Sequence, residues 1–210
     1  MDKLRKKQMK ALIKNGKNVA VKVVPELQIS KSNEVKIKVI YAGICRTDIY
    51  VAQGKIDSIS PLILGHEFSG IVTDLGTQVT KFELGDRVTV NPVITEQEGK
   101  CSTFLGIDRQ GAFAEYVIVP EEFVYKLPDH VDFKEGAYTE PIAAALAIFN
   151  ADIKPEQTGL IYGSNRIAKL TSRILQIYGF DNIDIYDTSQ GKILKENYYD
   201  YIIEIGRAHV

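Results

Sequence analysis

Gly65-His66-Glu67-Phe68-Ser69-Gly70 joins two potential metal ligands to the start of a β-rich run, Phe68–Thr73. Similar short runs lie on both sides of it, separated by glycine-containing turns. They are Val21–Val24, Glu34–Ile40, Arg87–Val90 and Ala114–Val119. Several short strands punctuated by glycine are typical of a barrel-like or sandwich-like all-β unit, not of βαβ repeats.

The pattern changes near Asp132, where Phe133–Ala151 becomes rich in Ala, Glu and Leu at helical spacing. An alternation of strand, turn, helix and strand follows, and it predicts the opening of a doubly wound parallel α/β domain. The expected elements are a strand at Gly159–Tyr162, a turn at Gly163–Ala168, a helix at Lys169–Tyr178 and a strand at Ile183–Tyr186.

Composition excludes several classes of protein. The chain has 210 residues, 45% of them hydrophobic, and its net charge of -1 gives no field that would attract nucleic acid or a membrane surface. We therefore expect neither as a partner. No stretch approaches the roughly 18 apolar residues of a membrane span, and the N-terminus lacks the features of a signal peptide. The expected location is the cytoplasm.

Three residues of types that bind zinc lie in recognisable motifs along the chain. Cys45 lies in Gly43-Ile44-Cys45-Arg46-Thr47-Asp48, His66 follows Gly65, and Glu140 precedes Pro141. A thiolate, an imidazole and a carboxylate are ligands of tetrahedral zinc, and a catalytic site keeps its fourth position open. Each residue alone is more often a core or turn residue, but the combination indicates a catalytic metal site.

At this point the sequence resembles the zinc-dependent medium-chain alcohol and polyol dehydrogenases. The resemblance runs from about Met9 to Glu204 and includes Gly65–Val72, Gly85-Asp86-Arg87-Val88 and Gly111-Ala112-Phe113-Ala114-Glu115-Tyr116. It implies a mixed β and α/β fold, in which a GroES-like β-barrel-type catalytic domain is followed by a partial doubly wound Rossmann domain.

The resemblance also implies roles for individual residues. Cys45 and His66 correspond to zinc ligands, and Glu67 and Glu140 to exchangeable carboxylate ligands. Thr47 corresponds to the hydroxyl that relays the alcohol proton. Tyr50 stands where many members have the next relay histidine, so either its phenol substitutes for that histidine or the proton leaves by another route. Arg46 corresponds to an arginine that contacts the cofactor pyrophosphate, for which its planar guanidinium is suited.

The first turn of the α/β region departs from the dinucleotide-binding pattern. A Gly-x-Gly-x-x-Gly turn lets the backbone approach the pyrophosphate, and here the run is Gly163-Ser164-Asn165-Arg166-Ile167-Ala168. Asn165 tolerates a positive φ, but its side chain is expected to intrude where phosphate comes close. Asp187 ends the second strand, where an acid accepts ribose hydroxyls and repels a 2'-phosphate, so NAD is favoured over NADP. The alternative is that Asp187 is only a turn residue before Thr188.

A second, structural zinc is not expected. Members that carry one have four closely spaced cysteines, whereas Cys101 is alone in the corresponding stretch, and one thiolate cannot close a four-ligand site. The predicted cofactors are therefore one catalytic Zn²⁺ and NAD.

The end of the sequence carries two further expectations. Tyr199–Glu204 resembles the fourth Rossmann strand, after which family members continue through later strands. Ile205–Val210 matches the translation of a widely used sequencing adapter, so we expect a non-native tail. The predicted domains are 1–150 (GroES-like zinc catalytic domain), 151–204 (first part of the NAD-binding domain) and 205–210 (tail).

The sequence as a whole predicts an oxidoreductase that oxidises a secondary alcohol, on a polyol, sugar or aminocyclitol-like small molecule, with hydride transfer to NAD. The full-length protein is expected to be a homo-oligomer. Zinc-free quinone reductases share the fold but generally lack the cysteine and histidine pair, which argues against them here. A non-catalytic truncated fragment or zinc-binding scaffold is the alternative from a different class.

Overall fold

A computed structural model describes residues 7–95, 102–187, 189, 194 and 196–205. The chain divides into two compact units, Met1–Glu140 and Pro141–Val210. No helix among the described residues is long and apolar enough to cross a membrane.

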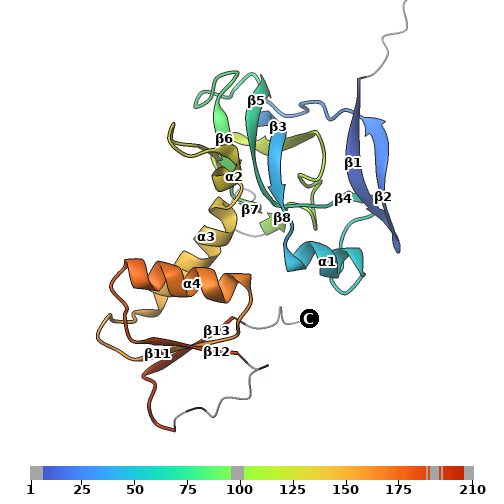
Figure 1. Cartoon of the computed structure of the whole chain (residues 1–210). Coiled ribbons are helices and arrows are strands. Elements are labelled where there is room, and N and C mark those ends of the chain that lie inside the picture. Colours follow the sequence, from blue (N-terminus) through green and yellow to red (C-terminus); the bar gives the residue numbers. More distant parts are fainter. Residues whose placement is uncertain (1–6, 96–101, 188, 190–193, 195, 206–210) are drawn as a thin grey trace, which may run out of the picture. The chain divides into compact units, whose positions relative to one another are not determined.

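The first unit is built from three antiparallel sheets (Figure 1). A five-stranded sheet has the order β10-β6-β5-β3-β9, a three-stranded sheet has the order β2-β1-β4, and β7 pairs with β8 in a hairpin. The strands are β1 (Gln8–Asn15), β2 (Asn18–Pro25), β3 (Glu34–Gly43), β4 (Leu62–Ile63), β5 (Glu67–Leu75), β6 (Arg87–Val90), β7 (Val93–Thr95), β8 (Ser102–Phe104), β9 (Tyr116–Pro120) and β10 (Val124–Lys126).

Irregular pairing in the five-stranded sheet bends it around its core. The register between β3 and β5 shifts between Lys36 and Ile37 and again between Val39 and Tyr41. Such bulges kink a strand and increase its twist, so the sheet curls. The alternating inward side chains then pack into one apolar cluster, which contains Val35, Ile37, Phe68, Val72, Val88, Val90, Val117 and Val119.

The predicted mixed β and α/β fold is confirmed, and each predicted strand of this unit falls on an observed one. The prediction missed the first strand, β1, and the short strands β4, β7, β8 and β10. In β1, Met9, Ala11 and Ile13 are buried on one face, while Gln8 and Lys10 are exposed on the other and Leu12 is partly buried there, as in a half-buried strand.

The single helical region expected at Phe133–Ala151 is wrong in detail, because it is three elements. They are α2 (Phe133–Gly136), α3 (Thr139–Leu146) and the 3₁₀ helix η2 (Ala147–Ala151); a further 3₁₀ turn is η1 (Glu121–Phe123). Pro141 explains the break between α2 and α3. It has no N–H to donate to the preceding turn, but it is tolerated within the first turn of a helix, so a new helix begins at Thr139.

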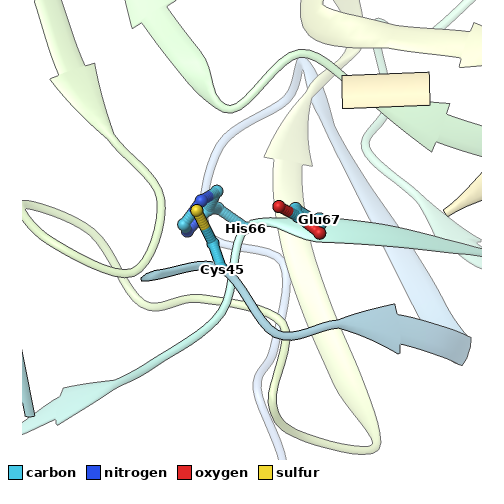
Figure 2. A group of neighbouring side chains, drawn as sticks. All are labelled: Cys45, His66 and Glu67. Atoms are coloured by element: carbon cyan, nitrogen blue, oxygen red, sulfur yellow. The ribbon is translucent and has the colours of Figure 1, made fainter. Parts of the chain in front are cut away.

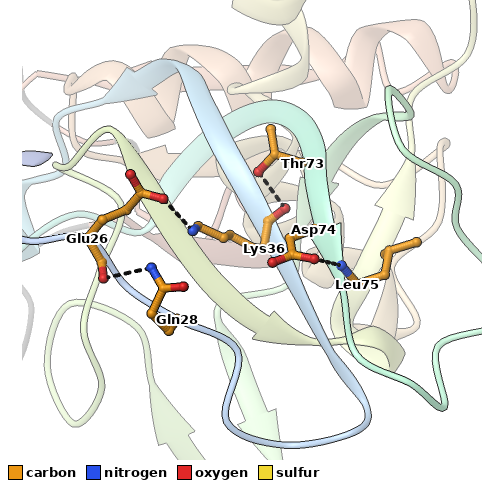
Figure 3. Close-up of polar contacts among 6 residues, drawn as sticks. All are labelled: Glu26, Gln28, Lys36, Thr73, Asp74 and Leu75. Atoms are coloured by element: carbon orange, nitrogen blue, oxygen red, sulfur yellow. Dashed lines mark hydrogen bonds and ion pairs between the residues drawn. The ribbon is translucent and has the colours of Figure 1, made fainter. Parts of the chain in front are cut away.

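A buried ion pair joins the segment after β2 to the first part of β3 (Figure 3). Nζ of Lys36 lies 2.6 Å from Oε1 of Glu26, and these side chains are only 6% and 10% exposed. The Lys36 ammonium also lies 5.0 Å from the centre of the Tyr116 ring. The carbonyl of Lys36 accepts a hydrogen bond from the Thr73 hydroxyl, which ties the same residue to β5.

The second unit is a parallel sheet with the order β12-β11-β13, covered on one face by α4 (Figure 1). Its elements are β11 (Gly159–Tyr162), α4 (Arg166–Ile177), β12 (Ile183–Tyr186) and β13 (Tyr201–Glu204). Since β13 pairs with β11 on the side opposite β12, it occupies the place of the fourth strand in a Rossmann sheet. The expected turn at Gly163–Ala168 is shorter than predicted, because α4 begins at Arg166.

Candidate metal centre

The loop between β3 and α1 (Arg46–Ala52) places Cys45 at the N-cap of the helix. The main-chain N–H of Cys45 donates a hydrogen bond of 2.9 Å to Oδ2 of Asp48, three residues later. This hydrogen bond gives a partner to the N–H of the N-cap residue at the start of α1. It also fixes where the thiol of Cys45 stands relative to α1.

His66 ends the turn before β5, and Glu67 is the first residue of that strand. Gly65 has φ of +97°, and a Cβ atom there would clash with the Phe113 ring, so only glycine fits. The N–H of Gly65 donates a hydrogen bond of 3.2 Å to Oδ1 of Asp48. One buried carboxylate therefore holds both the cysteine loop and the histidine turn.

Three of the four predicted ligands meet at this junction. One ligand atom from each of Cys45, His66 and Glu67 lies within 4.8 Å of the others. Figure 2 shows these side chains gathered between the end of β3 and the start of β5. His66 and Glu67 are buried, and Cys45 is partly exposed, which leaves an approach to the group. Gly43 makes room for it, because a Cβ atom at that position would overlap the Glu67 carboxylate.

The electrostatics of the site favour a cation. Burial alone would lower the pKa of His66, but its interactions with Asp48 and with the Cys45 thiol raise that pKa from 6.5 to about 10. Nδ1 of His66 lies 3.2 Å from Oδ1 of Asp48, yet no well-aligned hydrogen bond reaches this buried nitrogen among the described residues. A thiolate, an imidazole and a carboxylate at this separation fit the donor set and number of a catalytic zinc site.

The other predicted residues of this region lie on two helices. Arg46 is exposed at the first position of α1, whereas Thr47 and Tyr50 are both half-buried on the same helix. Their three-residue spacing makes Thr47 and Tyr50 neighbours on one face. Glu140 lies in the first turn of α3 and is not a member of the three-residue donor group.

The predicted nucleotide turn joins β11 to α4. Gly163 has φ of +129°, which requires glycine, but Asn165 has φ of −71° and needs no positive value. The Asn165 side chain caps α4 by accepting a hydrogen bond from the N–H of Ala168. Asp187 follows β12 and accepts hydrogen bonds from the N–H and hydroxyl of Ser189, as a turn residue does.

Some predicted features fall outside what the structure describes. Cys101 and residues 206–210 lie outside the described ranges. Conversely, sequence reasoning assigned no role to Asp48 or Gly43, which shape the donor group. An acid three residues after an N-cap is a capping-box signal and would have singled out Asp48. No sequence signal marks Gly43, because its clash partner comes from another strand.

Comparison with known proteins finds similarity to alcohol and polyol dehydrogenases. Residues 31–129 match the alcohol dehydrogenase GroES-like domain. Sorbitol dehydrogenase of Halalkalibacterium halodurans is 36% identical over 188 residues, which cover 81% of this chain and 54% of that protein.

Two solved structures superpose well on the chain. The 2R,3R-butanediol dehydrogenase of Bacillus subtilis gives a TM-score of 0.79 at 28% identity, over 89% of this chain and 65% of the other. A protein of Sinorhizobium meliloti 1021 bound to NADP gives a TM-score of 0.81 at 28% identity, over 94% of this chain and 62% of the other. The chain thus spans about half to two thirds of the length of these relatives.

Proposed function

Because residues 31–129 match an alcohol dehydrogenase GroES-like domain, in a chain similar to zinc-dependent medium-chain alcohol and polyol dehydrogenases, we propose that it belongs to a zinc- and nicotinamide-dependent oxidoreductase. The reaction is oxidation of a secondary alcohol, on a polyol, sugar or aminocyclitol-like molecule, with hydride transfer to NAD. The observation that carries this proposal is the meeting of Cys45, His66 and Glu67 donor atoms within 4.8 Å.

One zinc ion would be held by Cys45, His66 and a carboxylate. Glu67 is the carboxylate within the donor group, and Glu140 is the proposed exchange partner for it. Bound Zn²⁺ would act as a Lewis acid that lowers the pKa of the substrate alcohol. Asp48 holds both ligand-bearing loops through main-chain N–H groups, so the donors are kept in place before a cation arrives.

Thr47 is the proposed acceptor of the alcohol proton. It lies two residues after the thiol ligand and is half-buried, so its hydroxyl is close to the start of α1 without being fully exposed. Tyr50, its neighbour on the same helix face, receives the proton next and passes it outward. In this proposal the phenol of Tyr50 relays the proton in place of the histidine found at this position in many family members.

The nucleotide is proposed to bind where β11 meets α4. Gly163, Ser164, Asn165, Arg166 and Ile167 form the turn and the first residues of the helix, where main-chain N–H groups and the helix dipole attract phosphate. Arg46 is the proposed second phosphate contact, because its exposed guanidinium suits phosphate oxygens. Asp187 is proposed to favour NAD over NADP through the ribose.

The remaining expectations concern domain limits, location, oligomeric state and substrate. We retain domain limits of 1–150 and 151–204, a cytoplasmic location and a homo-oligomeric state as proposals. The substrate is a small alcohol; sorbitol and butanediol are the substrates named for two relatives.

Metal analysis combined with NAD titration tests the function. The dialysed chain should retain about one zinc, as a three-ligand catalytic site does. Cys45→Ser should lose most of it, whereas Cys101→Ser, the matched control, should not. Calorimetric titration should then detect NAD binding. Zinc retained equally by both variants would contradict the metal site, and zinc without NAD binding would contradict the dehydrogenase and support a zinc-binding scaffold.

A further inference from the structure

The strand order of the parallel sheet reverses between β11 and β13. β11 is the central strand, and the chain leaves it toward β12 on one side and returns as β13 on the other. In open α/β sheets, ligands bind outside the carboxyl ends of the strands at such a reversal of strand order. Whatever holds the ends of β11 and β13 together therefore shapes the nucleotide site proposed above.

Asn165 bridges these two strand ends with its side chain. Its Oδ1 accepts a hydrogen bond of 3.0 Å from the N–H of Ala168, and its Nδ2 donates one of 2.9 Å to the main-chain carbonyl of Ile205, directly after β13. Both polar atoms of the amide are thus satisfied within the protein. Because the Ile205 partner is a main-chain carbonyl, the contact does not depend on the side chain at that position.

Two further contacts converge on the same place. The N–H of Ile205 donates to the carbonyl of Tyr162, the last residue of β11. A Cβ atom at Gly163 would lie 2.8 Å from the carbonyl oxygen of Ile205, so the turn already approaches that carbonyl closely. Asn165 adds a side-chain bond to this close approach of main chains.

We propose that Asn165 is the positioning residue of the nucleotide site, a clamp that fixes the β11–α4 turn against the end of β13. This proposal rests on the proposed function. The expected intrusion of the Asn165 side chain into the phosphate approach is replaced by a different role, since its amide is directed to the third N–H of α4 and to Ile205. An asparagine at the second glycine position thereby keeps the turn in one shape.

The two halves of the amide can be tested separately. Asn165→Ser keeps an oxygen that can cap α4 but removes the donor to Ile205, and Asn165→Gly removes both. Asp132→Gly is the matched control, because it removes a cap from α2 in the other unit. Amide hydrogen exchange at Ala168 reports the cap of α4, and the ¹³C chemical shift of the Ile205 carbonyl reports the bond that this carbonyl accepts from Asn165. Calorimetric titration with NAD reports affinity.

We expect Asn165→Ser to shift the Ile205 carbonyl resonance but to keep the protection of the Ala168 N–H, and Asn165→Gly to change both. Both variants lack the bond to the Ile205 carbonyl, so each should bind NAD about three- to tenfold more weakly than the unsubstituted chain, the loss expected for that one shared hydrogen bond. The Asp132 control should bind NAD normally.

Equal or tighter NAD binding by the Asn165 variants would overturn the proposal, as would weaker binding with an unchanged Ile205 carbonyl resonance. If the Ala168 exchange and the Ile205 carbonyl resonance change as expected but no form of the chain binds NAD, the nucleotide function itself fails, and Asn165 is only a structural cap.

Discussion

Gly43 is the residue whose lack of a side chain permits the donor group to form. A Cβ atom there would overlap the carboxylate of Glu67, a residue that is only 1% exposed. We expect Gly43→Ala to displace Glu67 from Cys45 and His66 and to weaken zinc binding about tenfold to a hundredfold, the range seen when a supporting contact of a metal site is lost. Competition with a chelator measures the affinity.

Gly16→Ala is the control for this substitution. Gly16 has φ of +58°, so alanine is strained there, but a Cβ atom would meet nothing within 4 Å. The control should lower thermal stability without changing zinc affinity. If Gly43→Ala binds zinc as tightly as the unsubstituted chain, Glu67 is not held by this contact.

Asp48 is a second residue that supports the donor group indirectly, by holding the loops that carry Cys45 and His66. Its two carboxylate oxygens accept the N–H groups of Cys45 and Gly65, and the side chain is almost fully buried. Asparagine has an NH₂ donor where aspartate has a second acceptor oxygen. In Asp48→Asn, the main-chain N–H of Cys45 or of Gly65 would therefore face another donor. We expect the free energy of unfolding to fall by about 1–3 kcal/mol, the cost of a buried unsatisfied group, and zinc affinity to fall with it.

Urea denaturation with and without chelator measures both effects. Asp57→Asn, an exposed carboxylate in the same part of the chain, should change neither stability nor zinc affinity. An Asp48→Asn protein as stable as the unsubstituted chain would show that the two loops do not depend on this carboxylate.

At the scale of elements, the ion pair of Glu26 and Lys36 fixes how the segment after β2 packs on β3. Both side chains are at least nine-tenths buried, so removing one partner leaves a buried charge without compensation. We expect Lys36→Met to lower the free energy of unfolding by about 3–5 kcal/mol. Adding Glu26→Leu should recover most of that loss, because an apolar pair needs no compensation.

A double-mutant cycle in urea, followed by circular dichroism, measures the coupling of this pair. Asp152→Asn is the comparison, since it breaks the exposed ion pair with Lys154 and should have no measurable effect. Additive effects of the two core substitutions would mean that the pair is not coupled, and its burial would then need another explanation.

For the whole molecule, the two units have separate apolar cores. The core of the first unit is built on β3, β5, β6 and β9, and that of the second on β11, α4 and β13, with no shared residue. Zinc is therefore expected to stabilise only the first unit. At a free zinc concentration of 100 times Kd, the gain is about 2.7 kcal/mol.

Hydrogen exchange separates the units in a single experiment. Chelation should speed exchange in β3, β5 and α1 and leave β11 and α4 unchanged. Equal acceleration in both units would show that the metal stabilises the chain as one cooperative block.

The sequence by itself determined the fold class, most of the strands and the identity of three clustered donors. Alternating apolar residues specify strand faces locally, and glycine turns separate the strands, so β6, β11 and β12 were predicted with their observed limits. The strand β1 and the short strands were missed. A short strand such as β4, with two residues, carries too little periodicity to detect. Pro141 divided a helix that composition alone presented as continuous.

Only the tertiary structure decided how the sites are supported. Gly43 touches Glu67 from a neighbouring strand, Asp48 bonds Gly65 across a gap in sequence, and Asn165 reaches Ile205 beyond β13. These partners are far apart along the chain, and each depends on strand register and turn conformation together. Local patterns report which face a residue occupies, whereas contacts between distant segments exist only after the sheets have assembled.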